Sequence, residues 1–380
     1  MKMVFICSSL EPGRDGVGDY VRRLACELIA NNHRVIAIAL QDSFLTDIKN
    51  EEQEFNGIKL PVLRIPAQQS TAYRYGYLQT RLKFFKPNFI SLQYVGFGFN
   101  KYGLPVDMLL NLRKATGEVK LHIMLHELWC GMAASAGYKE KVLGLSQKVF
   151  LKMLIANLKP HAIFTSVEPY RLYLKQIGVK ASVIPIFGNI PTTDTGSEKD
   201  WQKLIETVNL SAIIHCPQNW LVLGFFGTTY NCPGLETMIN QANNAAKQAG
   251  LKLGILAIGN SRGVDVAELI KTLDGVVYWQ TGPLSAGTLN RVLQLADIGV
   301  VTSPVDGINK SGAAVAWMER GIPVIISAAD KTYHEDEMIG LGVYQAHSAN
   351  EVLKAYKAKG KIKPQNNLTK AAIAYTMDAV

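Results

Sequence analysis

The chain has 380 residues, and 48% of them are hydrophobic, which is enough for two separate cores. No apolar run reaches the roughly 18–20 residues that a membrane-spanning helix needs, so we expect a globular protein. The five cysteines are widely spaced and form no C-x-x-C pair, which argues against a disulfide framework and against a metal site. Because Met1 leads directly into a strand-like run, we also expect a cytoplasmic protein without a secretory signal.

The formal net charge of +9 is unevenly distributed along the chain. Residues 1–200 hold 25 Lys and Arg against 17 Asp and Glu, whereas residues 201–380 hold 15 against 14. The first half therefore carries +8, and this excess predicts an anionic partner such as a membrane surface or a phosphate-linked acceptor. We do not expect nucleic acid as the partner, because the chain has no zinc finger, no RNP-type motif and no long basic run.

In the first half of the chain, short apolar runs alternate with helical patterns. The sequence predicts strands at residues 2–7, 34–40, 60–65, 89–94, 120–126, 161–165 and 181–186. It predicts helices at residues 19–31, 74–84, 105–115 and 139–158. Apolar strands separated by helices indicate a parallel sheet that is covered on both faces.

A glycine-bearing loop follows the first predicted strand. Gly16 and Gly18 would let the backbone approach a ligand closely, so we predict that both contribute to a binding site. A dehydrogenase is an alternative, because these glycines followed by Asp42 partly match a dinucleotide fingerprint. The third glycine is absent, however, and five residues separate the strand from the glycines, so we disfavour this alternative.

The region from His126 to Lys159 holds two candidate features. His126 directly follows an apolar strand, which is a common place for a functional side chain, although a lone histidine is more often structural. Beyond it, lysines 141, 148, 152 and 159 form one stripe on a predicted helix. We expect either a core helix with a solvated lysine face or a basic helix that rests on anionic lipid.

The second half begins after a polar stretch at residues 192–200, where we place the domain boundary. Predicted strands run over 220–226, ending at Gly227, and over 253–258, ending at Gly259. Later, a polar loop at 306–312 leads into a helical block, and such a loop presents backbone N–H groups that suit a diphosphate. Lys310 adds a positive charge there, and Ser311 adds a hydroxyl for capping or for a phosphate contact.

The order of these motifs resembles the retaining glycosyltransferases of the two-Rossmann type, family 4-like. The resemblance covers nearly the whole chain and rests on residues 8–20, 24–28, 32–35, 220–227, 253–259, 278–283, 296–304 and 306–325. It implies an α/β fold of two facing Rossmann-like domains with parallel sheets and a cleft between them, the GT-B type. The implied parts are an acceptor-binding domain (1–195), a connector (196–218), a nucleotide-sugar-binding domain (219–362) and a final helix (363–380) that packs back on the first domain.

The resemblance also implies an activity. The protein would move a sugar from a nucleoside-diphosphate sugar to a hydroxyl of a glycan or lipid-linked acceptor, in surface polysaccharide or glycoconjugate synthesis, without a cofactor. Ligands in open α/β sheets bind beyond the carboxyl ends of the strands. The predicted donor-binding residues are Gly16, Gly18, Gly227, Thr228, Gly259, Asp306, Asn309, Lys310, Ser311, Gly312 and Glu319.

The predicted catalytic residues are Lys310, Asp19 and His126. Lys310 and the N–H groups near Gly312 would stabilise the leaving diphosphate. In a retaining enzyme, a phosphate oxygen takes the proton of the acceptor hydroxyl; in an inverting one, Asp19 or His126 is the candidate base.

The chain also departs from the family pattern. The two glutamates usual in the loop before the last Rossmann helix are replaced by Ile308 and Ala316, and Glu319 lies one helical turn further on. The Arg and Lys usual after strand 220–226 are missing as well. The alternative to an enzyme is therefore a catalytically degenerate subunit that binds nucleotide sugar or a partner protein.

We predict no metal ion. Single-Rossmann glycosyltransferases hold their metal with an Asp-x-Asp sequence after a central strand. The nearest equivalent here is the acidic stretch at 334–337, which lies late in the chain. We predict that it is the solvent-exposed start of a helix.

Overall fold

The computed structural model describes residues 1–377 except 133–135, 304, 328–337 and 339, and it leaves the side chains of 261, 262 and 306 undescribed. The chain divides into two compact units. Unit 1 comprises Met1–Ile186 and Leu368–Val380, and unit 2 comprises Phe187–Asn367. No helix in the described ranges is both long enough and apolar enough to cross a bilayer.

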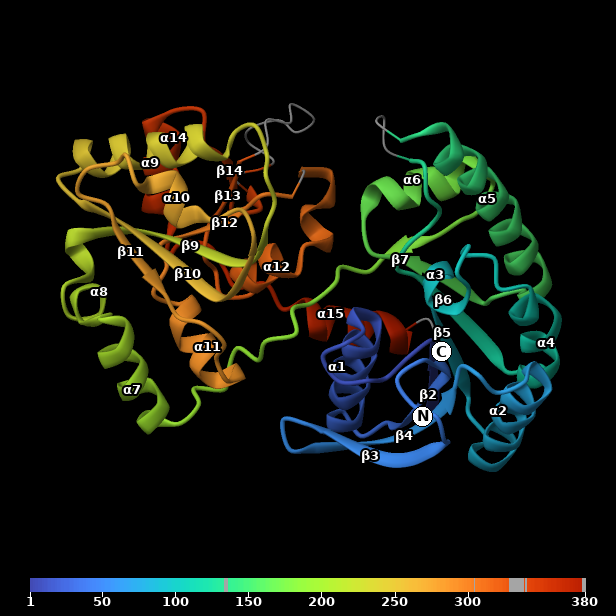
Figure 1. The fold of residues 1–380 in the computed structure, drawn as a ribbon. Coiled ribbons are helices and arrows are strands. Elements are labelled where there is room, and N and C mark those ends of the chain that lie inside the picture. Colours follow the sequence, from blue (N-terminus) through green and yellow to red (C-terminus); the bar gives the residue numbers. More distant parts are fainter. Residues whose placement is uncertain (133–135, 304, 328–337, 339, 378–380) are drawn as a thin grey trace. The chain divides into compact units, whose positions relative to one another are not determined.

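Unit 1 is built on an eight-stranded sheet with the order β3-β4-β2-β1-β5-β6-β7-β8 (Figure 1). Its strands are β1 (Lys2–Cys7), β2 (Arg34–Asp42), β3 (Lys49–Phe55), β4 (Ile58–Pro66), β5 (Phe89–Tyr94), β6 (Lys120–Leu125), β7 (Ala162–Thr165) and β8 (Ser182–Val183). Every pair is parallel except β3 with β4. The predicted parallel sheet is therefore confirmed, with one antiparallel strand added at its edge.

Strand β3 was not predicted, because its sequence is polar up to its last residue, Phe55. Asn56 and Gly57 have φ values of 50° and 76°, and Phe55 pairs with Ile58 across them. Two consecutive residues with positive φ form a type I′ turn, the tightest connection between antiparallel strands, and Asn-Gly is its preferred sequence. The Asn-Gly pair was thus the available signal for this hairpin.

Helices cover both faces of the unit 1 sheet. They are α1 (Gly16–Ala30), α2 (Thr71–Phe85), α3 (Gly96–Phe99), α4 (Val106–Thr116), α5 (Tyr138–Leu158), α6 (Glu168–Gln176) and α15 (Asn367–Met377). Val4 and Ile6 of β1 belong to a core that also takes in side chains of α2, α4 and α5. Phe5 contacts Tyr375 of α15, with ring centroids 5.7 Å apart. Because neighbouring strand residues point to opposite faces, α15 packs on the face opposite α2, α4 and α5, as Figure 1 shows.

Unit 2 has a six-stranded, all-parallel sheet with the order β11-β10-β9-β12-β13-β14. The strands are β9 (Trp220–Thr229), β10 (Lys252–Gly263), β11 (Val277–Gln280), β12 (Ile298–Val301), β13 (Val324–Ile326) and β14 (Val343–Gln345). Its helices are α7 (Glu198–Val208), α8 (Ser211–His215), η1 (Pro217–Asn219), α9 (Leu235–Gln248), α10 (Val266–Ile270), α11 (Ala286–Leu293), η2 (Val305–Lys310), α12 (Gly312–Met318) and α14 (Ala349–Ala358).

Trp317 of α12 anchors the last Rossmann helix on this sheet. It is fully buried, and it lies against the α-carbons of Gly224 in β9 and Gly299 in β12. A Cβ at either glycine would collide with the indole ring, so both strands need glycine at this level. The contact fixes α12, and with it the loop that precedes the helix, against the two central strands.

The segment between the two sheets is hydrogen-bonded to unit 2. The Arg320 guanidinium donates to the Pro191 carbonyl (3.1 Å), and Asn290 Nδ2 donates to the carbonyls of Thr192 (3.0 Å) and Asp194 (2.7 Å). The Arg291 guanidinium also stacks 4.2 Å above the ring of Trp201 in α7. Residues 187–218 therefore form part of unit 2, although the sequence analysis placed 187–195 in the first domain and 196–218 in a separate connector.

Candidate functional site

In unit 2, the loops that follow β9, β12 and β13 are tied together. The Tyr230 N–H donates to Thr302 Oγ1 (2.9 Å), which joins the loop after β9 to the end of β12. The Cys232 thiol lies 2.8 Å from Ser327 Oγ, which joins the same loop to the end of β13. These links gather three strand ends at the carboxyl edge of a parallel sheet, where open α/β sheets bind their ligands.

Two predicted glycines lie within longer strands than we expected. β9 continues past Gly227 to Thr229, and β10 continues past Gly259 to Gly263, so neither glycine ends its strand as predicted. Both have a φ of 80°, and the pairing of the two strands is irregular immediately after this level. A positive φ in paired strands is typical of a bulge that turns the chain, and it favours glycine. The exposed Thr228 lies directly beyond Gly227.

The backbone at this edge is open at several glycines. A Cβ built on Gly259, Gly307 or Gly312 would meet no atom within 4 Å, and one on Gly227 would meet only Ala313 Cβ at 3.8 Å. Gly312 is exposed and begins α12. The carboxyl edge of unit 2 therefore presents main chain that another molecule can approach.

The loop before α12 forms a short 3₁₀ helix, η2, which ends at Lys310. Asn309 is exposed, Lys310 is half-buried, and the side chain of Asp306 lies outside the described atoms. The Ser311 hydroxyl caps α12 by accepting from the Ala314 N–H at 3.3 Å. This oxygen is used for capping, the first of the two roles predicted for it.

Glu319 is directed toward the segment between the sheets. The residue is 5% exposed, and its Oε1 accepts from the Gly188 N–H at 3.0 Å. Ile308 and Ala316, which stand where the family pattern has glutamates, are both buried. No carboxylate thus stands at either glutamate position, and donor binding by Glu319 stays a prediction.

In unit 1, the glycine loop is closed by its own side chains. Asp15, which the sequence analysis overlooked, caps α1 by accepting from the N–H groups of Val17 (2.8 Å) and Gly18 (2.9 Å). A Cβ on Gly18 would lie 2.6 Å from the Ser9 carbonyl oxygen, whereas one on Gly16 would meet nothing within 4 Å. Gly18 is therefore required for packing within the loop, and only Gly16 leaves space for a ligand.

Asp19 stabilises the same loop. It forms an ion pair with Arg22, and its Oδ1 accepts from the Gly13 N–H at 3.1 Å. The chain thus already uses the carboxylate that we considered as a base.

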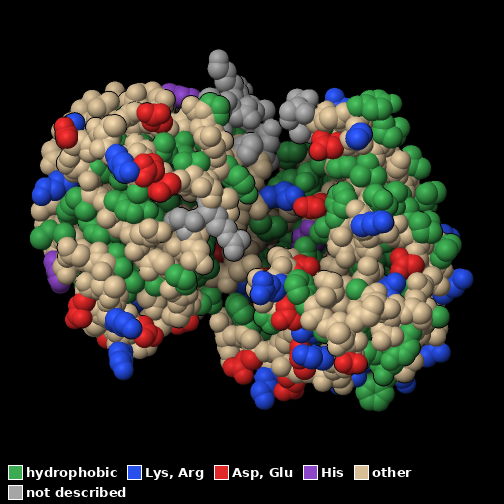
Figure 2. All heavy atoms as spheres, in the orientation of Figure 1, with side chains coloured by type: hydrophobic (Ala, Val, Ile, Leu, Met, Phe, Trp, Pro, Cys, Tyr) green, Lys and Arg blue, Asp and Glu red, His purple; other side chains and the backbone are tan. Residues whose placement is uncertain are grey.

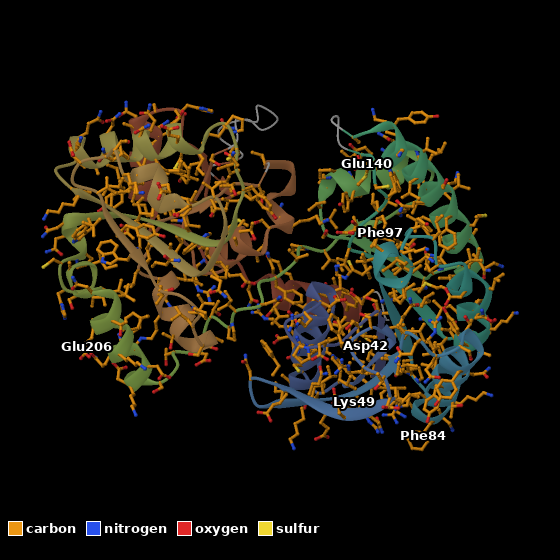
Figure 3. All side chains as sticks on the ribbon, viewed as in Figure 1. Asp42, Lys49, Phe84, Phe97, Glu140 and Glu206 are labelled. Carbon is orange, nitrogen blue, oxygen red and sulfur yellow. The ribbon has the colours of Figure 1, made fainter. Side chains whose placement is uncertain are left out.

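Asp42 fixes the loop from the neighbouring strand (Figure 3). Its side chain accepts from the N–H groups of Leu10 (3.1 Å) and Phe44 (3.0 Å) and from Arg64 Nε (2.8 Å). Burial alone would raise the pKa of Asp42, but the hydrogen bond from Arg64 and those from the two N–H groups lower it below its ordinary value. Asp42 is therefore a charged structural residue, which gives the dehydrogenase alternative no support.

His126 lies at the end of β6 in a buried polar network. Gln93 Nε2 donates to Ser91 Oγ (2.7 Å) and to Tyr375 Oη (3.1 Å), which orients Gln93 Oε1 toward His126 Nε2 at 2.9 Å. An amide oxygen only accepts, so His126 Nε2 carries the proton in this arrangement. The ring of Tyr20 meets the imidazole edge to face at 4.8 Å.

The network extends to the C-terminal helix. Burial raises the pKa of both Tyr375 and Tyr20. Gln93 and Tyr375 were not singled out from the sequence, because they are 282 residues apart and only the fold brings them together. His126 is thus held by side chains of β5 and α1 and, through Gln93, by α15.

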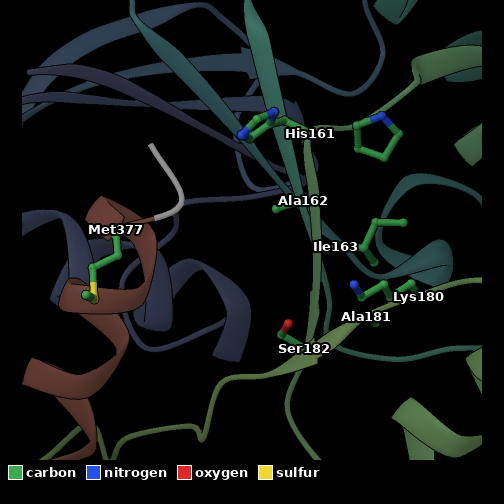
Figure 4. A pocket seen from close by; sticks show the side chains of 8 residues that line it. His161, Ala162, Ile163, Lys180, Ala181, Ser182 and Met377 are labelled. Atoms are coloured by element: carbon green, nitrogen blue, oxygen red, sulfur yellow. The ribbon is translucent and has the colours of Figure 1, made fainter. Parts of the chain in front are cut away.

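The described surface pockets lie away from the predicted site residues. One, of about 500 Å³, is lined by Pro160, His161, Ala162, Ile163, Lys180, Ala181, Ser182 and Met377 at the β7–β8 edge of unit 1 (Figure 4). Among the described residues, no group of three or more His, Cys, Asp or Glu side chains is placed to hold a metal ion. The acidic stretch 334–337 lies outside the described residues.

Comparison with protein-family models found no match, and neither did comparison with curated protein sequences. The fold is similar to that of sucrose-phosphate synthase from Thermosynechococcus elongatus, with a TM-score of 0.55 and 16% identity over 100% of this chain and 96% of that one. It is similar to the catalytic domain of starch synthase IV from Arabidopsis thaliana bound to ADP and acarbose (TM-score 0.51, 14% identity, 100% and 98% covered). It is also similar to UDP-GlcNAc 2-epimerase from Neisseria meningitidis bound to UDP-GlcNAc (TM-score 0.51, 11% identity, 100% and 99% covered). At these identities the likeness concerns architecture alone, and it confirms the predicted fold class: the chain has the GT-B fold with two parallel-sheet, Rossmann-like domains.

Proposed function

We propose that the protein is a glycosyltransferase that takes a sugar from a nucleoside-diphosphate sugar. The observation that carries this proposal is the open carboxyl edge of the unit 2 sheet. There the ends of β9, β12 and β13 are tied together, and Gly227, Gly307 and Gly312 leave main chain accessible beside Lys310. Backbone N–H groups with a nearby lysine suit a diphosphate. The fold alone does not decide the activity, since transferases and an epimerase share it.

The proposed mechanism places charge stabilisation in unit 2. When the bond between the sugar C1 and the diphosphate oxygen breaks, negative charge develops on the diphosphate. Lys310 and the N–H groups near Gly312 then stabilise it without a metal ion, and this is usually the largest catalytic effect. The acceptor hydroxyl bonds to C1 on the same face, and its proton passes to the departing phosphate oxygen, so configuration is retained.

The contacts in unit 1 support a mechanism that needs no side-chain base. Asp19 is paired with Arg22, and His126 Nε2 is hydrogen-bonded to Gln93. We therefore assign His126 a role in positioning the acceptor and Asp19 a role in shaping the loop.

We further propose that the acceptor is a glycan or a lipid-linked sugar, in surface polysaccharide or glycoconjugate synthesis. The protein would act in the cytoplasm, at the inner face of the membrane. The support is electrostatic: residues 71–159 of unit 1 hold thirteen Lys and Arg against four Asp and Glu, a balance equal to the net charge of the chain. An anionic lipid surface that carries the acceptor would complement this charge.

A second candidate function is nucleotide-sugar binding without turnover. The observation in its favour is that Ile308 and Ala316 are packed in the core where the resembling enzymes have acids. Slow release of nucleoside diphosphate from a donor sugar, abolished in Lys310→Ala, would support the enzyme. Donor binding without any release would support the binding protein.

A thermal-shift panel of UDP, GDP, ADP and TDP tests the donor site. A ligand at one hundred times its dissociation constant adds about 2.7 kcal/mol of apparent stability. For the preferred nucleotide, Lys310→Ala should cost about 1.5–3 kcal/mol of binding free energy, the scale of a hydrogen bond to a charged group. Lys247→Ala, at an exposed position in α9, is the matched control and should leave the affinity unchanged. Equal affinities for the wild type and Lys310→Ala would remove Lys310 from the site.

A further inference from the structure

Helix α5 exposes a stripe of apolar side chains. Val142, Leu145, Val149 and Met153 are all exposed, Leu145 to 63%. Their spacing of three, four and four residues places them on one side of the helix. The opposite side, with Phe150, Leu151, Leu154 and Leu158, fills the core instead. The stripe is therefore solvent-facing, and this surface cannot be an ordinary charged helix face.

Two neighbouring helices also expose apolar side chains. Helix α4 packs against both α2 and α5 on one face of the sheet. It exposes Val106 and Leu110, and α2 exposes Tyr73, Tyr77 and Phe84, the last to 80% (Figure 3). We call these exposed side chains of α2, α4 and α5 the three-helix face. It holds about half of the large hydrophobic side chains that are exposed in the described part of the chain, a concentration typical of an interaction site.

Cations surround this apolar surface. Lys139, Lys141 and Lys152 of α5 are exposed, and none of them forms an ion pair with a carboxylate among the described residues. The acids nearby are already used, because Asp107 pairs with Arg74, Glu118 pairs with Arg113, and Glu140 accepts from the Gly137 N–H. Figure 2 shows hydrophobic and cationic side chains side by side over the margin of unit 1 where Figure 1 places α4 and α5.

We propose that the three-helix face docks on the surface of an anionic bilayer. Lysine side chains reach the phosphate headgroups while the aliphatic and aromatic groups enter the upper acyl region, as in interfacial amphipathic helices. A second copy of the chain is a poorer occupant, because two faces of the same positive sign repel each other. The inference rests on the proposed function in one respect: a lipid-linked acceptor would lie in the bilayer to which this face binds.

Sedimentation with vesicles tests the docking, using full-length protein and no donor sugar. We expect binding to vesicles with about 30% phosphatidylserine, and much weaker binding to pure phosphatidylcholine. Raising the salt from about 0.1 M to about 0.5 M should weaken binding without abolishing it, because the apolar insertion is not screened. Binding that is equal on both lipids, or absent on both, would overturn the proposal.

Two double variants separate the two components of binding. Lys141→Glu with Lys152→Glu should lower the partition coefficient at least about 25-fold, since each cation near an anionic surface contributes about fivefold. Leu145→Gln with Val149→Gln should lower it about tenfold or more and leave the remaining binding fully sensitive to salt. Both pairs are exposed, so we expect folding to be unaffected.

Matched controls lie outside the face. Lys203→Glu with Lys247→Glu makes the same change in net charge at exposed positions of unit 2, and Ile373→Gln replaces an exposed apolar residue of α15. Both should bind vesicles as the wild type does, and an equal loss in these controls would contradict a localised face. Nucleotide thermal shifts measured on the same variants keep the two proposals apart. A variant that loses vesicle binding but keeps its nucleotide shift tests the three-helix face alone. A wild-type protein that shows no nucleotide shift at all would contradict the donor site and leave the face untouched.

Discussion

The carboxyl ends of the strands are organised differently in the two units. In unit 1, side chains close the ends: Asp15 caps α1, Asp42 holds the Leu10 N–H, and Gln93 holds His126. In unit 2, the corresponding edge exposes main chain at Gly307 and Gly312. The contrast indicates that unit 2 recognises a ligand through backbone and charge, whereas unit 1 presents a fixed surface of side chains.

Removing the charge of Asp42 should give the largest effect. Asp42→Asn removes one carboxylate from the buried Arg64, which keeps its ion pairs with Glu11 and Glu51, so we expect the lower end of the about 3–5 kcal/mol that breaking a buried pair costs. The pKa of Asp42 is lowered in the folded state, so its stabilisation is present above the unfolded pKa and is lost as the pH falls through the folded pKa. Urea unfolding should therefore show the wild type losing stability below about pH 4 more steeply than the variant. Parallel pH profiles for the two proteins would contradict this account.

Gly18 tests whether the unit 1 loop is closed by packing. A Cβ there would lie 2.6 Å from a backbone oxygen, so Gly18→Ala should destabilise unit 1 by about 2 kcal/mol through forced displacement of the loop. Gly16→Ala, two residues earlier in open space, should change stability by less than about 0.5 kcal/mol. If thermal unfolding gave equal effects at the two positions, the claim that packing at Gly18 closes the unit 1 loop would be wrong.

Gly312 tests whether the unit 2 edge is open for binding. Gly312→Leu should leave stability within about 0.5 kcal/mol, because the position is exposed and unobstructed. Because leucine would cover the backbone N–H groups, the nucleotide affinity should nevertheless fall at least about tenfold, or about 1.4 kcal/mol. Thermal shifts at several nucleotide concentrations measure this affinity. Gly76→Leu, at an exposed and unobstructed position of α2, is the control and should leave nucleotide binding unchanged. Equal affinities for the wild type and Gly312→Leu would contradict an open binding edge in unit 2.

Tyr375→Phe should give the smallest effect. It removes the acceptor of one hydrogen bond from Gln93, which is worth about 1 kcal/mol of stability. The NMR signal of the His126 ring should shift, because Gln93 is then oriented by Ser91 alone, and that of the exposed His215 should remain in place. An unchanged His126 signal would show that Gln93 is held without the C-terminal helix.

The sequence predicted the helices and strands well, but it predicted less well which side chains are buried and what they contact. Apolar runs identified the buried parallel strands, because a strand covered on both faces is apolar along most of its length. The same logic missed β3, a mostly polar strand at an edge, and it left open whether 139–158 is a core helix or a surface-binding one, because periodicity cannot say which side of a helix is covered.

Two site residues show why the rest could not be predicted. Gly18 looked like a ligand-facing glycine, but only the folded loop shows the Ser9 oxygen against it. Glu319 was predicted to bind the donor because it lies one helical turn beyond Ala316, and its contact with the Gly188 N–H, 131 residues away, could not be foreseen. Such roles depend on contacts between distant segments, which the local sequence does not encode.

The two edges of the unit 1 sheet have a consequence for how the protein behaves at high concentration. An edge strand with unpaired N–H and C=O groups is a template on which another chain can add a strand and start aggregation. One edge is β3, which carries Glu51, Glu52 and Glu54, and the other is β8, which is only two residues long. The charges of β3 and the short length of β8 discourage such pairing. The protein should therefore not associate through its sheet edges or form fibrils even when it is concentrated.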